Sequence, residues 1–417
     1  MPDLPASPIP LYASRALALY AQRLAAPPQV TANAEAIFDT VKGLGSIHID
    51  TLQVVARSQY LALWSRLGNY DTTLLDELLF HPQKKRLFEY WKKAASVIPL
   101  EHYRYSLPRM RQRLEEPRKS WVNWLKRESS AEALELVRKR IASEGALRAA
   151  DFEHDRKRGA WWDWKPAKAA LEYLYGIGEL MIRDRVNFQR VYDLPQRTLP
   201  AWVDRTAPTR EEADRHDVEL ALRALGLCQA SSLADYTYLL QQRIRPVLED
   251  LRGEGLLFNV TGEASGGGTC ELLLHRERLE DLQRALDGDL QPRHSTLLSP
   301  FDSLLWSKRQ GHVFWNYQHD IELYVPQPKR KWGYFTLPLL HRDRLVGRLD
   351  PKLERDTGTL HIRALHLEPG VEPDERLVSD LAAAIRDFMA FHDATQLKFG
   401  RRGHVQFRVK LRGELGV

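Results

Sequence analysis

A chain of 417 residues that is 43% hydrophobic predicts about two to four globular domains. Its 61 lysines and arginines only slightly exceed its 55 aspartates and glutamates, a balance that permits a nucleic-acid partner without requiring one. Two cysteines exclude a disulfide framework or a cysteine zinc site, and since neither a signal peptide nor a membrane-spanning run is recognisable, we expect a cytoplasmic protein without membrane contact.

The first part of the chain alternates helical and extended patterns. Residues 1–13 are rich in proline and predict a loose lead-in, after which Ser14 is expected to cap a helix. Asn33 is expected to cap a second helix, and residues 46–50 then predict a short strand. A helical pattern follows over residues 52–64, so the order of elements suits a winged-helix unit.

The predicted strand carries two titratable side chains on one face. In an extended segment, side chains two positions apart point the same way, so Ile47 and Ile49 share one face while His48 and Asp50 share the other. Such a pair is either part of a catalytic site or an ordinary polar strand face. On composition alone the structural interpretation is the commoner one.

The middle of the chain repeats a similar order of elements. Residues 108–127 form a basic bridge, which is either a solvated helix face or a surface that faces DNA. A helix, a turn, a helix over 166–175 and a hairpin within 177–194 follow. Beyond a proline-punctuated linker the order returns, with a turn at 266–268. Three aromatic residues before the second helix are expected in the core: Trp161, Trp162 and Trp164.

From about residue 297 the pattern becomes extended. It predicts a small antiparallel sheet whose first hairpin has a basic tip, then a long helix over 377–391, and a last strand within 401–413. We therefore expect an α+β chain of three tandem winged-helix units followed by a small antiparallel β-rich domain with a C-terminal helix. The predicted domains cover residues 14–128, 129–200, 205–290 and 297–417.

The chain lacks the motifs of metal and cofactor chemistry. Its 14 histidines are scattered without an HExxH pair, and there is no GxSxG, Walker or Rossmann signature. We therefore expect no metal and no cofactor. What remains is an acid–base pair that acts alone, or no chemistry.

Four blocks, taken in order, resemble a known family. They are GSIHIDTLQVVARSQYLALWSRLGNYD, RLFEYWKKAASVIPLEHYRYSLPRM, SPFDSLLWSKR, and ELYVPQPKRKWGYFTLPLL with LVGRLDPK. Together they are similar to the AlkZ/YcaQ (AlkX) family of bacterial DNA glycosylases over residues 14–390. The resemblance implies tandem winged-helix units, hydrolysis of the N-glycosidic bond of N7-alkylated guanine, and unhooking of mustard-type interstrand crosslinks.

The resemblance also implies a catalytic pair. The family motif is Gln-x-Asp in the YcaQ-like branch and Gln-x-Gln in the AlkZ branch, whereas this chain has His48-Ile49-Asp50. Asp50 matches the YcaQ-like branch and His48 departs from both. A carboxylate at position 50 would stabilise positive charge that develops on the sugar and would orient the attacking water. His48 would hold that water or the Asp50 geometry.

Double-stranded DNA with alkylated or crosslinked guanine is the expected partner. The basic hairpin tip, Lys329, Arg330 and Lys331, is the first candidate to hold it, because cationic side chains neutralise phosphates. Arg57 and Arg66 are second candidates, although a solvent-facing helix surface explains them as well. In the third block, Ser299, Asp302 and Arg309 either serve the site or only brace the fold.

The expected enzyme is a monomeric, monofunctional glycosylase that leaves an abasic site. The main alternative is a non-enzymatic tandem winged-helix DNA-binding protein, such as a transcriptional regulator. Two features weigh against it, namely the modest net charge and a carboxylate at position 50 that would repel phosphate. A scaffold that uses its β-rich part for protein contacts is a third interpretation, which no residue pattern singles out.

Overall fold

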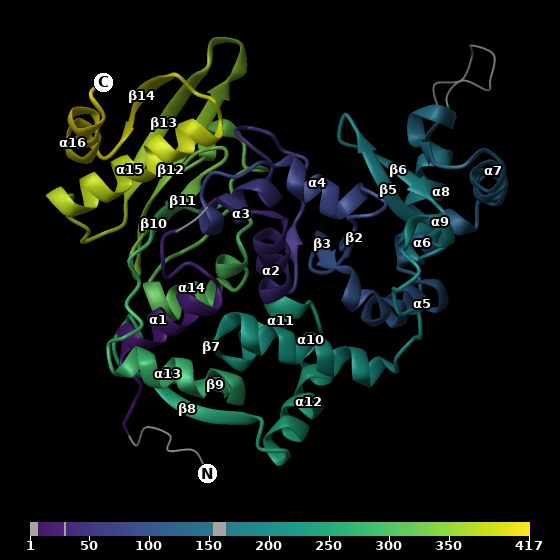
Figure 1. Ribbon diagram of the computed structural model, residues 1–417, viewed down its shortest axis with the longest axis horizontal. Helices are drawn as coiled ribbons and strands as arrows, with labels where there is room; N and C mark the ends of the chain where they lie inside the picture. Colours follow the sequence, from purple (N-terminus) through teal and green to yellow (C-terminus); the bar gives the residue numbers. More distant parts are fainter. Residues whose placement is uncertain (1–6, 29–30, 153–163) are drawn as a thin grey trace. The chain divides into compact units, whose positions relative to one another are not determined.

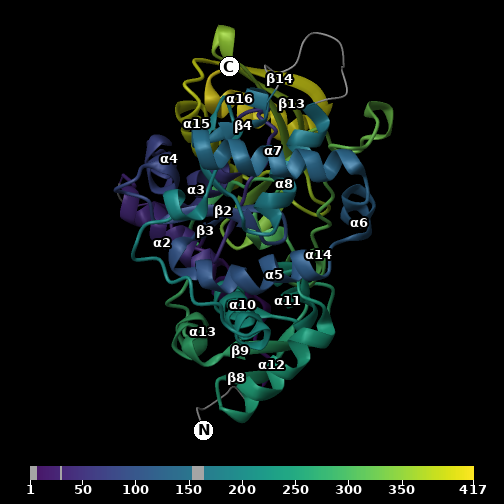
Figure 2. The same cartoon turned by 90° about the vertical axis from the view of Figure 1, so that its right-hand side faces the viewer.

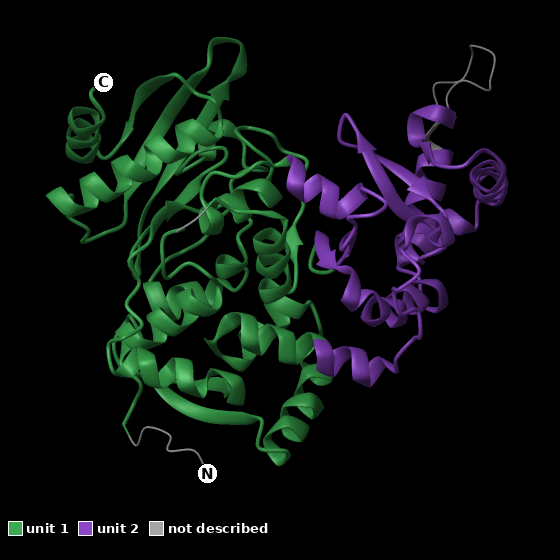
Figure 3. Ribbon diagram, in the orientation of Figure 1, with its two compact units in different colours: residues 1–72, 92–94, 217–417 green, residues 73–91, 95–216 purple. Residues whose placement is uncertain are grey.

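The computed structural model describes residues 7–28, 31–152 and 164–417 (Figure 1). It is a mixed α+β fold with many helices and several small sheets. Two compact units divide the chain (Figure 3): one holds residues 1–72, 92–94 and 217–417, and the other holds residues 73–91 and 95–216. The predicted core positions of Trp161 and Trp162, and the side chain of Trp164, lie outside what the structure describes.

The first unit contains the N-terminal and C-terminal parts of the chain. Its helices are α1 (Leu11–Ala21), α2 (Ala34–Leu44), α3 (Ser58–Leu67), α11 (Ala230–Thr237), α12 (Gln241–Gly253), α13 (Leu279–Leu286), α14 (Lys308–Trp315), α15 (Glu375–Phe391) and α16 (Val405–Leu415). Its strands are β1 (Ile47–His48), β7 (Leu227–Cys228), β8 (Leu257–Glu263), β9 (Thr269–His275), β10 (Ser295–Leu297), β11 (Leu337–His341), β12 (Arg344–Glu354), β13 (Thr359–Leu367) and β14 (Gln396–Gly403).

The second unit has a core of its own. Its helices are α4 (Thr73–Phe80), α5 (Leu107–Glu115), α6 (Lys119–Leu125), α7 (Glu128–Glu144), α8 (Trp164–Gly176) and α9 (Pro195–Thr198). Its strands are β2 (Leu87–Trp91), β3 (Ala95–Pro99), β4 (Leu147–Arg148), β5 (Met181–Val186) and β6 (Gln189–Asp193), while α10 (Arg210–Leu225) begins in this unit and ends in the first. The basic bridge over 108–127 lies in α5 and α6.

Similar element orders recur along the chain. The segment α7–β4–α8–β5–β6 forms a sheet of order β4-β6-β5, and α10–β7–α11–α12–β8–β9 forms one of order β7-β9-β8. The hairpin predicted within 177–194 is confirmed as β5 and β6, and the turn predicted at 266–268 joins β8 to β9 with positive φ at Gly267 and Gly268. The three winged-helix units and their borders remain predictions.

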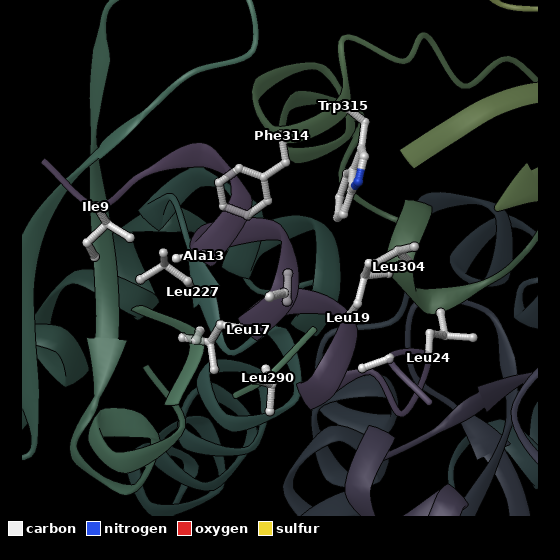
Figure 4. Packing of buried hydrophobic residues seen from close by; sticks show 14 of the residues in the cluster. Ile9, Ala13, Leu17, Leu19, Leu24, Leu227, Leu290, Leu304, Phe314 and Trp315 are labelled. Atoms are coloured by element: carbon white, nitrogen blue, oxygen red, sulfur yellow. The ribbon is translucent and has the colours of Figure 1, made fainter. Parts of the chain in front are cut away.

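Helix α1 lies at the centre of the first unit's core (Figure 4). Leu17 and Leu19 are fully buried and belong to one cluster with Leu227, Leu304 and Phe314, which come from distant parts of the chain. Burying apolar surface on several sides of one helix ties those segments together. The N-terminal helix therefore holds the third repeat-like segment and the β-rich part in one unit.

Two predictions at the N-terminus are wrong where the structure describes the chain, from residue 7 onward. Helix α1 begins at Leu11, so Ser14 is a buried residue inside it and not its cap. Ile9, just before this helix, is attached, because its N–H donates to the Thr261 carbonyl at 2.8 Å and its carbonyl accepts the Glu263 N–H at 2.9 Å. These bonds add Ile9 to the edge of β8, which a proline-rich composition did not reveal.

The C-terminal sheet has the order β10-β11-β12-β13-β14. Its first pairings are antiparallel, but β14 pairs parallel with β13, which corrects the prediction of an antiparallel sheet. Parallel neighbours need a crossover connection, and α15 supplies it. Helix α15 packs on β10 and β11, and Figures 1 and 2 show α16 beside β14. The predicted strand over 401–413 is also wrong beyond Gly403, because His404 caps α16 by accepting the Phe407 N–H.

The predicted basic hairpin is a loop. We call residues 321–336 the basic loop; it contains one 3₁₀ turn, Gln327–Lys329, and no strand before β11. Pro326 and Pro328 cannot donate to a strand ladder. The Glu322 carboxylate accepts the N–H groups of Lys331, Trp332 and Gly333 at 2.7 to 3.0 Å, so these donors are used inside the loop.

Candidate active site

The predicted catalytic strand follows helix α2, whose two ends are defined by local chemistry. The Asn33 side chain accepts the Ala36 N–H at 2.9 Å, as predicted for an N-cap. Gly45 ends the helix with φ of 75°, and a Cβ at this position would lie 1.8 Å from a Leu220 methyl carbon. Only glycine therefore lets the chain turn from α2 into β1 at this point.

Asp50 presents a partly exposed carboxylate just after β1. Its Oδ1 atom accepts the Leu52 N–H at 2.7 Å, and its side chain is 18% exposed. The two isoleucines of the opposite face, Ile47 and Ile49, are buried as the alternating pattern predicts. The carboxylate therefore has one oriented oxygen and one oxygen that is available to a ligand or to water.

The segment after Asp50 is not helical, so the prediction of a helix over 52–64 is wrong in its first part. Helix α3 begins at Ser58. The Asp50 carboxylate competes for a backbone N–H, which favours a turn over a helix. In addition, the Val54 carbonyl accepts the Leu353 N–H at 3.2 Å, and the Val55 carbonyl accepts the Arg355 guanidinium. These bonds attach the segment after Asp50 to β12 and to the turn that follows β12.

His48 is held in a stack. Its ring lies on the Phe301 ring, with centroids 4.7 Å apart and planes 23° apart. Its Nε2 atom is 3.9 Å from Asp50 Oδ2, which is longer than a hydrogen bond. Burial lowers the pKa of His48 to about 4; the Asp50 carboxylate opposes this change and the Lys93 ammonium adds to it. His48 is therefore a neutral imidazole at neutral pH.

The Ser299–Arg309 block builds the wall behind His48. Ser299 Oγ lies 3.0 Å from Ser58 Oγ and accepts the Phe301 N–H at 3.2 Å. The Phe301 carbonyl accepts Trp306 Nε1 at 2.9 Å, so the backbone of Phe301 is held at both its N–H and its carbonyl. Ser299 thus acts as a brace, one of the two roles considered for it, while Arg309 is exposed.

Arg66 is buried in the fold, which corrects the prediction that it contacts DNA. Its two terminal nitrogens bind Asp302 at 2.7 and 2.8 Å, and both side chains have no solvent exposure. Its Nε atom donates to the Gln22 carbonyl at 2.8 Å. Arg66 and Asp302 therefore brace α3 against the Ser299–Arg309 block. Arg57, just before α3, is partly exposed and remains a candidate DNA contact.

Sequence reasoning missed Lys93 as a neighbour of the site. Lys93 Nζ donates to the Trp306 carbonyl at 2.9 Å, and its charge acts on His48. Burial lowers the pKa of Lys93, and Asp235 opposes that change. The only signal was a stretch of mixed basic and aromatic residues, which singles out no position. Phe301 likewise lies within the Ser299–Arg309 block, whose sequence gives this position no signal of its own.

The basic loop lies in the same unit and exposes its charges. Lys329 and Lys331 are exposed, and the Arg330 guanidinium lies 4.8 Å from the Tyr334 ring centroid. Tyr324 is 93% exposed, a feature that the sequence patterns did not reveal. The structure therefore brings His48, Asp50 and Arg57 together in one segment and places the lysines on a separate loop.

Arg348 supports the base of this loop. It is buried between the rings of Tyr317 and Trp332, at 4.4 and 4.3 Å from their centroids, and it donates to Glu368. Burial alone would raise the pKa of Glu322, but the hydrogen bonds from the loop backbone outweigh it and lower that pKa. The loop is therefore held by an ionised carboxylate and a sandwiched guanidinium.

Within the described ranges, no three His, Cys, Asp or Glu side chains lie close enough to hold a metal ion. No helix in the same ranges is long and apolar enough to cross a membrane.

Two comparisons with known proteins agree. The family model described as DNA glycosylase AlkZ-like matches residues 41–391, which include β1, α3, the Ser299–Arg309 block and the basic loop. The solved structure of Streptomyces sahachiroi DNA glycosylase AlkZ matches with a TM-score of 0.61, covering 95% of this chain and 100% of that chain. The two sequences are 15% identical, so the structural likeness shows a shared fold.

Proposed function

The chain belongs to the AlkZ-like family of DNA glycosylases, and from this premise we propose that it removes N7-alkylated guanine from double-stranded DNA. Membership makes it a DNA repair hydrolase that acts on N-glycosidic bonds. The proposal adds the lesion, the crosslink and the residues that carry the reaction. The observation that carries it is the Asp50 carboxylate, partly exposed, oriented by the Leu52 N–H and next to a neutral imidazole.

Asp50 has the charge that the reaction needs. N7 alkylation makes guanine cationic and therefore a good leaving group, and the transition state carries positive charge on the sugar. A fixed carboxylate beside that charge lowers its free energy without reorganising at the moment of reaction. The same carboxylate accepts a hydrogen bond from the attacking water and takes up its proton as the bond to the sugar forms.

His48 acts as a positioning residue in this proposal. A neutral imidazole has one donor and one acceptor nitrogen, so it can hold a water molecule without adding positive charge. The stack on Phe301 limits the ring to a narrow range of orientations. A cationic histidine would oppose the charge that grows on the sugar, so the low pKa of His48 suits this role.

The basic loop and Arg57 are the proposed DNA contacts. Lys329 and Lys331 are exposed on the loop and can neutralise backbone phosphates. Tyr324, exposed on the same loop, can stack on a base, since aromatic side chains often accompany cationic ones at such surfaces. This combination would grip the duplex without base-specific hydrogen bonds.

We also propose that mustard-type interstrand crosslinks are unhooked. A crosslinked guanine cannot rotate far out of the duplex as a single damaged base can, so the enzyme would contact both strands during the reaction. The proposed enzyme is a monofunctional monomer that needs neither metal nor cofactor and leaves an intact abasic site.

The test is base release from duplex DNA that contains one N7-methylguanine or one nitrogen-mustard crosslink. We expect release of the free base, abasic sites that break only after alkali, and no covalent product trapped by borohydride. Binding of the same duplexes without release of any base would refute the proposed reaction. That result is the one expected of a tandem winged-helix regulator. Borohydride trapping would contradict the monofunctional assignment alone.

A further inference from the structure

Three arginines converge on one pocket beside the basic loop. The pocket has a volume of about 190 Å³, and its lining includes Arg330 of the loop, Arg363 of β13 and Arg402 of β14. The lining also includes Asp350 of β12 and Gly333 of the loop. All of these residues belong to the first unit.

Each guanidinium is held by protein atoms that use only part of its hydrogen-bonding capacity. Arg363 Nη2 donates to Asp350 Oδ1 at 3.0 Å, and Arg402 Nη2 donates to the Lys331 carbonyl at 2.9 Å and to the Arg330 carbonyl. Arg330 donates through Nε to the Val325 carbonyl at 2.8 Å. Since a guanidinium has five N–H donors, each side chain is fixed in position and still has donors for a ligand.

One of these donors is buried without a partner. Arg363 Nε has almost no solvent exposure and donates to no atom among the described residues. Buried donors are normally satisfied, and one that is not identifies a place where an acceptor is missing. The Asp350 carboxylate does not fill this role in the structure, because it binds Arg363 through Nη2 and not through Nε.

The charges favour an anion with several oxygen acceptors. Three guanidinium groups and one carboxylate leave an excess of two positive charges around the pocket. Arginine forks bind phosphate oxygens through paired hydrogen bonds, with better geometry than a point charge provides. A phosphate oxyanion is therefore the ligand chemistry that the lining fits best.

The pocket is built in advance of any ligand. A Cβ on Gly333 would lie 2.5 Å from Asp350 Cγ, so this side of the pocket requires glycine. Glu322 fixes the backbone from Lys331 to Gly333 by accepting three N–H groups. Phe335, whose N–H binds Asp350, has its ring centroid 6.5 Å from that of Phe301, on which His48 stacks.

We propose that this three-arginine pocket binds one backbone phosphodiester of the damaged duplex and thereby seats the strand that Asp50 acts on. The DNA source of the phosphate rests on the proposed function, whereas the affinity for a phosphate oxyanion does not. A free phosphate group is the other source with the same chemistry, and the experiment separates the two.

The experiment measures DNA affinity against salt concentration for the full-length chain and for Arg402→Gln, Arg363→Gln and Arg401→Gln. Arg401 is the matched control, because it is the exposed neighbour of Arg402 on β14, loses the same charge and does not line the pocket. We expect Arg402→Gln and Arg363→Gln each to weaken binding about three- to tenfold and to reduce the salt slope by about one. Thermal unfolding of each variant checks that it is folded.

A duplex series with one neutral methylphosphonate at each position identifies the phosphate. At one position, the methylphosphonate should weaken binding by the wild type but cause no further loss of affinity in Arg402→Gln. The reason is that the two changes remove the same contact. Inorganic phosphate should raise the melting temperature of the wild type and of Arg401→Gln more than that of Arg402→Gln.

Equal losses in Arg401→Gln and Arg402→Gln would overturn the proposal, because they would show general attraction by charge. Stabilisation by inorganic phosphate with unchanged DNA affinity in the variants would overturn the DNA assignment in favour of a free oxyanion. The binding assay does not depend on base release, so the two proposals can fail separately. If the wild type shows these binding effects but releases no base, the proposed function is refuted while the pocket assignment stands.

Discussion

Replacing His48 by glutamine separates positioning from charge. With a pKa of about 4, about one His48 ring in a thousand is protonated at pH 7, so the neutral imidazole is the predominant form. Glutamine keeps a donor and an acceptor but loses the stack on Phe301, which is worth about 0.5 to 1.5 kcal/mol for an aromatic pair. We therefore expect His48→Gln to change the single-turnover rate of base release by less than roughly tenfold.

The pH dependence of the base-release rate tests the neutral state of His48 more directly than the rate at one pH. Single-turnover release from N7-methylguanine duplex is measured from pH 5 to 8.5, with spontaneous loss subtracted. The wild-type rate should show no step near pH 6.5 that depends on residue 48. A step between pH 6 and 7 that disappears in His48→Gln would refute the assignment of a neutral imidazole, and a loss far beyond tenfold would show imidazole chemistry of its own.

The same pKa predicts a stability effect with a definite sign. The folded-state pKa of about 4 lies below the ordinary value of 6.5, so the unfolded chain binds more protons between these values. The stability contributed by neutral His48 is therefore present above pH 6.5 and lost as the pH falls toward 4. It amounts to roughly 3 kcal/mol, and His48→Gln should remove that part of the pH dependence of urea unfolding.

Three other changes have separate expected outcomes. Arg66→Met should lower the free energy of unfolding by about 3 to 5 kcal/mol, because it leaves Asp302 as an unpaired buried charge. The DNA affinity of the folded protein should stay unchanged. Lost DNA affinity with normal stability would instead show that Arg66 contacts DNA. Lys329→Gln with Lys331→Gln should do the reverse, reducing the salt slope of binding by about two with unfolding unchanged, and an unaltered slope would refute this contact. Tyr324→Ala should weaken DNA binding and base release at unchanged stability while Tyr324→Phe retains both, and equal behaviour of the two variants would exclude stacking.

Local chemistry made several elements predictable. Asn33 and Gly45 bound α2 because a side-chain cap and a left-handed residue are decided by a few neighbouring atoms. The buried face of α15 follows the helical period of Leu377, Leu381 and Ile385. Likewise the alternation of Ile47 and Ile49 placed His48 and Asp50 on one face, which the burial pattern supports.

The incorrect predictions concern features that depend on contacts between residues far apart in the sequence. The basic loop has the sequence pattern of a hairpin, but the Glu322 carboxylate, nine to eleven residues away in the sequence, binds its backbone N–H groups and holds it as a loop. The pairing of β14 depends on a crossover by α15 and not on residues in the strand itself. Arg66 looked like a surface cation because its partner, Asp302, is 236 residues further along the chain.

The candidate site likewise combines residues that the local sequence predicts with residues that only the fold brings together. Asp50 was identified from its own segment and from the family blocks, while Phe301 and Lys93 reach His48 through folding alone. Neither residue stands in a pattern that marks it as part of a site. Phe301 affects the orientation of His48, and Lys93 affects its charge state.

Asp50→Asn is the measurement that tests the central claim most directly. Asparagine keeps the shape and an Oδ1 acceptor for the Leu52 N–H, so the segment should stay folded while the negative charge is lost. In single-turnover assays on N7-methylguanine duplex, we expect base release to fall by at least about a hundredfold, with DNA affinity unchanged or slightly tighter. A variant that binds DNA normally and releases base within tenfold of the wild-type rate would contradict the account.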